Sequence, residues 1–285
     1  MIILTIVGAR PQIIKAAALS RVISNNFQNI EEIIVHTGQH YDKNMSDVFF
    51  TELEIPKPQI NLKVGSSSHG AQTALMIEKI EKVVQEYLPD VVVVYGDTNS
   101  TLATAIVASK LHIPIVHIES GLRSFNKKMP EEVNRILCDH VSTLLFSPTK
   151  SGFNNLLNEG FSKEYSNKSS ADHPNIYHCG DVMYDNSLYF SKLSDENSDI
   201  LEKLKLQNEK FILATVHRND NTDSKIKLTD LFSTFLEITE IHLLKIILPL
   251  HPRTSKMMEQ LLDSKLLKKI QESNLLTIIN PAGFL

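Results

Sequence analysis

The chain has 285 residues, of which 42% are hydrophobic and 22% are charged, and its formal net charge is −4. This composition is typical of a globular protein of about two domains, and the charge gives no general footprint for nucleic acid or for an anionic membrane. Because no apolar run approaches the roughly 20 residues of a membrane helix, and the two cysteines form no Cys-x-x-Cys pair, we expect a cytoplasmic protein with neither nucleic-acid nor membrane partners.

Apolar runs and helix-periodic segments alternate through the first part of the chain. The runs are continuous, which is typical of strands that are buried on both faces of a parallel sheet. A proline near the start of the first helix suits its first turn. The predicted strands are 2–7, 31–36, 91–94, 113–118 and 143–146, and the predicted helices are 13–23, 45–53, 71–87, 100–111, 130–140 and 150–159.

A polar segment at 162–174 indicates a domain boundary, so we predict a first domain over 1–170 and a second over 171–285. Both domains have the alternating pattern of an α/β fold with parallel sheets. The second contains few strand–helix units and ends just after a strand, so we expect it to be truncated at its C-terminus. Its predicted strands are 175–178, 211–216, 245–250 and 275–279, and its helices are 227–242 and 256–272.

Three acidic residues follow strands or start helices, where open α/β sheets bind their ligands. Asp97 follows a strand and precedes a helix, so it is either a functional carboxylate or a helix cap. Glu119 follows a wholly apolar strand and suits proton transfer, unless it only pairs with Arg123 or another base. Glu131 begins a helix, where it either acts on a substrate or pairs with Arg135 four residues on.

Basic residues occupy equivalent positions after other strands. Arg10 follows the first strand and starts a helix, with Lys15 about one turn further on. Backbone amides, the helix dipole and the guanidinium together favour a phosphate group, although an exposed structural turn would look the same. His217 and His251 each follow a strand of the second domain, which favours anion recognition over capping. No histidine spacing indicates a metal site, and no dinucleotide or P-loop fingerprint is present.

Six motifs, in chain order, resemble those of a known family: GARPQ at 8–12, TGQH at 37–40, YGDTNST at 95–101, HIESGLR at 117–123, MPEEVNR at 129–135 and TVHR at 215–218. The family is that of the non-hydrolysing UDP-N-acetylglucosamine 2-epimerases. The resemblance implies two Rossmann-like domains of the glycosyltransferase-B (GT-B) kind with the UDP-sugar between them, no cofactor and no metal, a homodimer, and a role in polysaccharide biosynthesis. It also implies elimination of UDP through a 2-acetamidoglucal, followed by re-addition.

The resemblance further implies roles for individual residues. The catalytic residues would be Asp97, Glu119, Glu131 and His217. Substrate-binding residues would be Arg10, Lys15, Arg135 and His251. A loop associated with allosteric activation would include Gln39 and His40.

Alternative functions remain open from the sequence. Several motifs are closer to a branch that epimerises UDP-2,3-diacetamido-2,3-dideoxyglucuronate. A GT-B glycosyltransferase would share the fold and a UDP-sugar but would need an acceptor. The family's Ser-Gly-Gly segment, which holds the diphosphate and uridine, is expected beyond Leu285, so a third alternative is an inactive module that only binds the UDP-sugar.

Overall fold

The computed structural model describes residues 1–38 and 57–281 of the chain. Contacts divide it into two compact units, Met1–Lys192 and Leu193–Leu285. Among the described residues, no helix is both long enough and apolar enough to cross a membrane. The predicted helix at 45–53 and the residues Gln39 and His40 lie outside the described residues.

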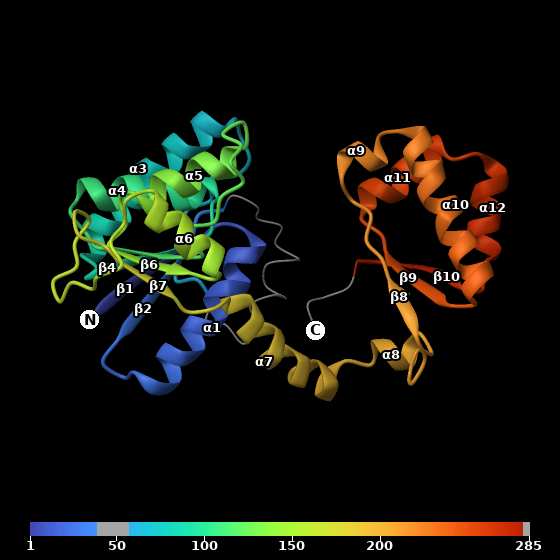
Figure 1. The fold of residues 1–285 in the computed structure, drawn as a ribbon, viewed down its shortest axis with the longest axis horizontal. Coiled ribbons are helices and arrows are strands. Elements are labelled where there is room, and N and C mark those ends of the chain that lie inside the picture. Colours follow the sequence, from blue (N-terminus) through green and yellow to red (C-terminus); the bar gives the residue numbers. More distant parts are fainter. Residues whose placement is uncertain (39–56, 282–285) are drawn as a thin grey trace. The chain divides into compact units, whose positions relative to one another are not determined.

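The first unit is built on a parallel sheet, which has seven strands within the described part of the chain (Figure 1). Their order is β3-β2-β1-β4-β5-β6-β7, so the sheet grows outward in both directions from the β1–β4 pair. This reversal of strand order is the place where open α/β sheets bind ligands. The strands are β1 (Ile2–Val7), β2 (Glu31–His36), β3 (Ile60–Asn61), β4 (Val91–Tyr95), β5 (Ile115–Ile118), β6 (Leu144–Ser147) and β7 (Asn175–His178).

Helices connect these strands and cover both faces of the sheet (Figure 1). The apolar side chains of β1, β2 and β4 that point to one face pack against α3 and α4, where Met76, Ile80 and Ala103 are fully buried. Helix α1 lies on the other face, as Figure 1 shows. The helices are α1 (Arg10–Asn26), α3 (His69–Tyr87), α4 (Asn99–Lys110), α5 (Pro130–Asp139), α6 (Lys150–Asn158) and α7 (Val182–Asn197).

The observed division of the chain lies about 20 residues beyond the predicted boundary after residue 170. The reason is that β7 pairs in parallel with β6 and so completes the first sheet. Helix α7, which was not predicted, is held against α1 by Asn186, whose Nδ2 donates to the carbonyl of Ile14 at 2.6 Å. The guanidinium of Arg21 also stacks on Tyr189, 3.9 Å from the ring centroid. These contacts are long-range and have no local sequence signal.

The second unit has a parallel sheet of three described strands in the order β10-β9-β8, with its own core around Leu228, Phe232 and Leu248. The prediction of one helix over 256–272 was wrong. The segment forms two helices, because Asp263 caps the second with an Oδ1 contact of 2.9 Å to the amide of Leu266. The elements are α8 (Ile200–Lys203), β8 (Phe211–Leu213), α9 (Asn219–Thr222), α10 (Lys225–His242), β9 (Lys245–Pro249), α11 (Pro252–Leu261), α12 (Ser264–Glu272) and β10 (Leu276–Ile279).

Candidate functional site

The ends of the neighbouring strands β4 and β5 form the centre of the candidate site. Gly96 follows β4 and Glu119 follows β5, and both adopt left-handed backbone conformations, with φ of +62° and +72°. A Cβ atom on Gly96 would lie 3.1 Å from Oε2 of Glu119. The two strand ends therefore bring the Glu119 carboxylate close to the turn that carries Asp97. A non-glycine residue with this φ stores strain, which is more frequent at functional sites than elsewhere.

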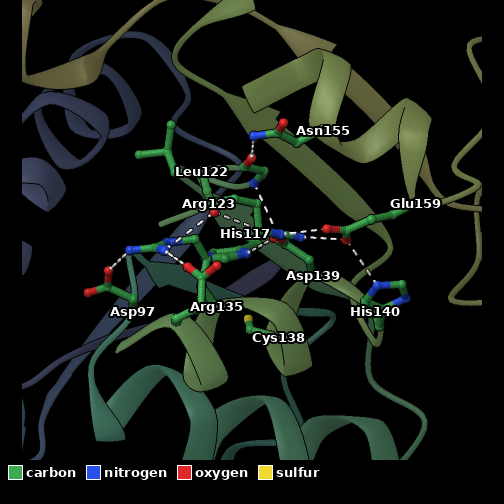
Figure 2. A network of polar contacts seen from close by, with 12 residues as sticks. Asp97, His117, Leu122, Arg123, Arg135, Cys138, Asp139, His140, Asn155 and Glu159 are labelled. Carbon is green, nitrogen blue, oxygen red and sulfur yellow. Dashed lines mark hydrogen bonds and ion pairs between the residues drawn. The ribbon is translucent and has the colours of Figure 1, made fainter. Parts of the chain in front are cut away.

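Asp97 is not the cap of helix α4. That position belongs to Thr98, whose side chain accepts from the amide of Thr101. The Asp97 carboxylate pairs instead with Nη2 of Arg135, while Nη1 of the same guanidinium contacts Oε2 of Glu132 at 2.7 Å. Arg135 therefore bridges two carboxylates and fixes the direction in which Asp97 points (Figure 2).

Glu119 pairs with Lys15 of helix α1, not with Arg123. Both side chains are largely shielded from solvent, with 11% of the lysine and 26% of the glutamate side chain exposed. Glu131 is exposed at the first turn of α5, one residue before the buried Glu132. The first unit thus presents two ion-paired carboxylates and a third, exposed one close to Arg135 in the sequence.

The turn from β1 to α1 is held against the same region. Gln12 caps it, because its Oε1 accepts from the amide of Gly8 at 2.8 Å and from that of Ala9 at 3.2 Å. Its Nε2 donates to the carbonyl of Tyr95 at 2.7 Å, so one buried amide joins this turn to the end of β4. Arg10 is exposed at the first position of α1. Its cationic side chain suits an anionic ligand.

A buried charge network lies behind the strand ends (Figure 2). Asp139 at the end of α5 contacts Arg123 at 2.7 Å and the ring of His117 at 2.7 Å. Arg123 also pairs with Glu159, directly after α6, again at 2.7 Å. Burial, the largest influence, raises the pKa of Asp139, but His117 and Arg123 outweigh it, and the pKa lies below its ordinary value. Arg123 is therefore a structural cation and not the partner of Glu119.

Sequence reasoning gave no role to Gln12, Glu132, Asn134 and Asp139. Asn134 holds the site as well, since its Nδ2 donates to the Asp97 carbonyl at 2.9 Å. One signal was available in the sequence. A histidine such as His117 in an apolar, buried strand must find polar partners, and these were to be sought at neighbouring strand and helix ends.

The two predicted histidines belong to the second unit. His217 is exposed beyond β8, and His251 caps α11 with an Nδ1 contact of 3.3 Å to the amide of Arg253. The two loops are joined by Thr254, whose hydroxyl donates to the carbonyl of Val216 at 2.8 Å. Arg253 is paired with Asp223 through both carboxylate oxygens at 2.7 Å. The two loops therefore present exposed imidazoles at adjacent strand ends.

Together, the groups of the first unit suit acid–base chemistry on a bound anion. Asp97 and Glu119 are oriented carboxylates, each paired with a cation, and carboxylates can act as general acids or bases. Glu119 also borders an apolar pocket that includes Val93, Ile118 and Phe146. The cations beside the two carboxylates suit a polar ligand with anionic groups.

Comparison with known proteins identifies similar chains. Residues 23–285 match the family described as UDP-N-acetylglucosamine 2-epimerase. A UDP-N-acetylglucosamine 2-epimerase homolog of Methanococcus maripaludis is 50% identical, over 100% of this chain and 74% of its own length. The UDP-2,3-diacetamido-2,3-dideoxy-D-glucuronate 2-epimerase of Pseudomonas aeruginosa is 46% identical, with the same two coverages.

Solved structures agree with the sequence comparison. The Methanocaldococcus jannaschii UDP-GlcNAc 2-epimerase in complex with UDP-GlcNAc and UDP is 40% identical, with a TM-score of 0.79. The similarity covers 100% of this chain and 74% of that structure. The expected α/β class with two Rossmann-like units of the GT-B kind is confirmed.

Proposed function

The chain belongs to the UDP-N-acetylglucosamine 2-epimerase family, and from this premise we propose that it interconverts UDP-GlcNAc and UDP-ManNAc without hydrolysis. The observation that supports this function best is the pair of oriented carboxylates, Asp97 and Glu119, at adjacent strand ends. Inversion at C2 needs proton-transferring groups on both faces of the sugar ring, which one carboxylate cannot supply.

The proposed reaction is an elimination followed by an addition. A carboxylate takes the proton from C2 while the bond between C1 and UDP breaks, and the electron pair of the C2–H bond forms the C1=C2 double bond of 2-acetamidoglucal. UDP then returns to C1 and a proton returns to the opposite face of C2. Asp97, Glu119 and Glu131 are the proposed acid–base groups, with His217 as a further catalytic group from the second unit.

The cations have a separate proposed role. Arg10 and Lys15 at the start of α1 and His251 in the second unit would bind the diphosphate, which becomes the leaving group. Positive charge at that position stabilises the negative charge that develops on UDP as the bond to C1 breaks. Arg135 would orient Asp97 and contact the substrate. Gln39 and His40 stay a proposed allosteric loop, and the homodimer, the cytoplasmic location and the role in polysaccharide biosynthesis stay predictions.

The test is exchange of the C2 proton with solvent. We expect the protein to incorporate deuterium at C2 of UDP-GlcNAc in D₂O and to form UDP-ManNAc. Proton NMR would follow both changes. Asp97→Asn, Glu119→Gln and Glu131→Gln should each reduce exchange by about 10²-fold or more. Glu81→Gln, on the exposed surface of α3, is the matched control. Full activity in all three site variants would contradict the assignment of the site.

A second candidate substrate is favoured by the Pseudomonas aeruginosa relative, which is named for UDP-2,3-diacetamido-2,3-dideoxy-D-glucuronate. The same exchange experiment with that sugar nucleotide compares the two by kcat/KM. A glycosyltransferase would leave C2 unchanged and need an acceptor. A module that only binds would raise the melting temperature in the presence of UDP-GlcNAc without exchange.

A further inference from the structure

His117 lies in the middle of β5 and is fully buried. Its two ring nitrogens have different partners, both at 2.7 Å. Nδ1 contacts a carboxylate oxygen of Asp139 (Figure 2). Nε2 contacts the main-chain carbonyl of Gly96. The ring therefore spans the distance between the end of helix α5 and the turn after β4.

Both partners of the ring are hydrogen-bond acceptors. A carbonyl and an ionised carboxylate have no proton to donate, so each contact needs an N–H on the ring, and only the imidazolium carries two. Burial is the largest influence on the His117 pKa and lowers it, but Cys138 and Asp139 raise it more, and the pKa lies well above the ordinary histidine range. His117 is thus a buried cation, with Asp139 as its counter-ion.

The Nε2 contact reaches the centre of the candidate site. Gly96 directly precedes Asp97, and its amide donates to the carbonyl of Ile118 at 2.9 Å. A Cβ atom added to Gly96 would lie 3.1 Å from Oε2 of Glu119. The carbonyl that His117 holds therefore belongs to the peptide that connects β4 to Asp97 and lies beside Glu119.

The other end of the ring is firmly anchored. Asp139 accepts from the amide of Gly121 at 3.1 Å and pairs with Arg123 at 2.7 Å, so its carboxylate cannot follow a moving ring. Gly121 itself is packed closely, since a Cβ there would lie 2.4 Å from the carbonyl oxygen of Gly152. The ring consequently connects a fixed carboxylate to the turn that carries Asp97.

We propose that His117 is a positioning residue for the proposed epimerisation. It holds the Gly96 carbonyl through Nε2–H and thereby fixes the position of Asp97 relative to Glu119. The inference rests on the proposed function. A merely structural histidine would stabilise the fold by the same contacts. It would not change turnover in molecules that remain folded.

Two amide variants separate the contacts of the ring. The amide nitrogen of asparagine lies near the place of Nδ1, so His117→Asn keeps a donor for Asp139 and loses the one for Gly96. In His117→Gln the amide nitrogen reaches the place of Nε2, so it keeps the donor for Gly96. Both variants are measured well below their melting temperatures, with His242→Asn, exposed at the end of α10, as the control.

We expect His117→Asn to reduce kcat for C2 exchange by about 10²-fold, with KM within about threefold, because a misplacement near 1 Å has that effect on turnover. His117→Gln should recover at least about tenfold of that loss. Equal kcat in the two variants, or the wild-type kcat in His117→Asn, would overturn the proposal. Absence of exchange in the wild-type protein with either sugar nucleotide would instead overturn the proposed function, and the role of His117 with it.

A measurement on the wild-type protein needs no variant to fold. In protein with ¹⁵N-labelled histidine, both ring nitrogens of His117 should show protonated chemical shifts at pH 7.5, with two slowly exchanging N–H protons. A ring with an unprotonated Nε2 would overturn the proposal, because Nε2 could then not donate to the Gly96 carbonyl.

Discussion

At the scale of single residues, Glu131 and Glu132 show how neighbours of the same type take different roles. Glu132 is 1% exposed, and its carboxylate accepts from the amides of Ser124 and Phe125, each at 2.9 Å. Burial, the strongest single influence, raises the Glu132 pKa. These amides and Arg135 together outweigh it, so the pKa lies below its ordinary value. Glu131 is exposed and remains available to a ligand. The buried carboxylate therefore holds the loop, and the exposed one is the proposed acid–base group.

We expect Glu132→Gln to lower the free energy of unfolding by about 1–3 kcal/mol, because an amide NH₂ would face a donor and leave a buried group unsatisfied. Glu131→Gln should leave stability within about 0.5 kcal/mol of the wild type and reduce exchange by about 10²-fold or more. Urea unfolding and the C2 exchange rate check the pair. Equal losses of stability in both variants would contradict the division of roles.

At the scale of elements, Asp139 joins β5, α5 and α6 through the network of Figure 2. Its pKa in the folded protein is lower than in the unfolded chain. The ionised carboxylate therefore adds stability at pH values above its ordinary pKa of 3.8. This contribution is lost as the pH falls through the lower, folded value.

The expected pH dependence is a fall in the free energy of unfolding below about pH 4, measured by urea unfolding at several pH values. Asp139→Asn should lower stability at pH 7 by about 3–5 kcal/mol, because it leaves His117 and Arg123 without their shared counter-ion. The variant should also lose less stability than the wild type between pH 5 and pH 3. If Asp139→Asn lost as much unfolding free energy as the wild type between pH 5 and pH 3, other carboxylates would cause the loss.

The break between α11 and α12 also belongs to the scale of elements. Asp263 supplies the cap that ends the predicted single helix, with its Oδ1 accepting from the amide of Leu266. We expect Asp263→Ala to lower stability by about 1 kcal/mol, whereas Asp263→Asn, which can still cap, should lower it by less than half of that. Thermal unfolding of the three proteins provides the comparison. The same loss in both variants would assign the effect to charge and not to capping.

At the scale of the whole molecule, the two units have separate cores. Met76 and Ile80 are fully buried in the first, and Phe232 and Leu228 are fully buried in the second. Each core is assembled from strands and helices of its own unit. Apolar truncation should therefore act mainly on the unit that contains it.

We expect Phe232→Ala to lower the stability of the second unit by about 3–5 kcal/mol through loss of buried surface and the cavity left behind. Hydrogen exchange should then accelerate in β9, while the amides of β4 keep their protection. Met76→Ala is the reciprocal variant and should accelerate exchange in β4. Equal acceleration in both units for either variant would show that they unfold as one.

Much of the fold and part of the site follow from local sequence. Apolar runs determine the buried parallel strands, and the carboxyl ends of such strands share one edge, so Asp97, Glu119 and Arg10 were expected near one another. The end of the first unit could not be predicted, because the predicted strand 175–178 could join the sheet of either unit, and helix α7 was not recognised. Only pairing with β6 and the contacts of Asn186 decide between them.

The sequence by itself determined which residue types stand at the strand ends. Apolar runs and helical periodicity are local properties of the sequence, and they locate the strands and helices. Only the tertiary structure decided which partner each of them has. Asp97 meets Arg135, Glu119 meets Lys15, and His117 meets Asp139. These partners are far apart in the chain, and the free energy of ion pairing depends on distance in space. In the same way, Glu131 and Glu132 differ only in what the folded chain places around them.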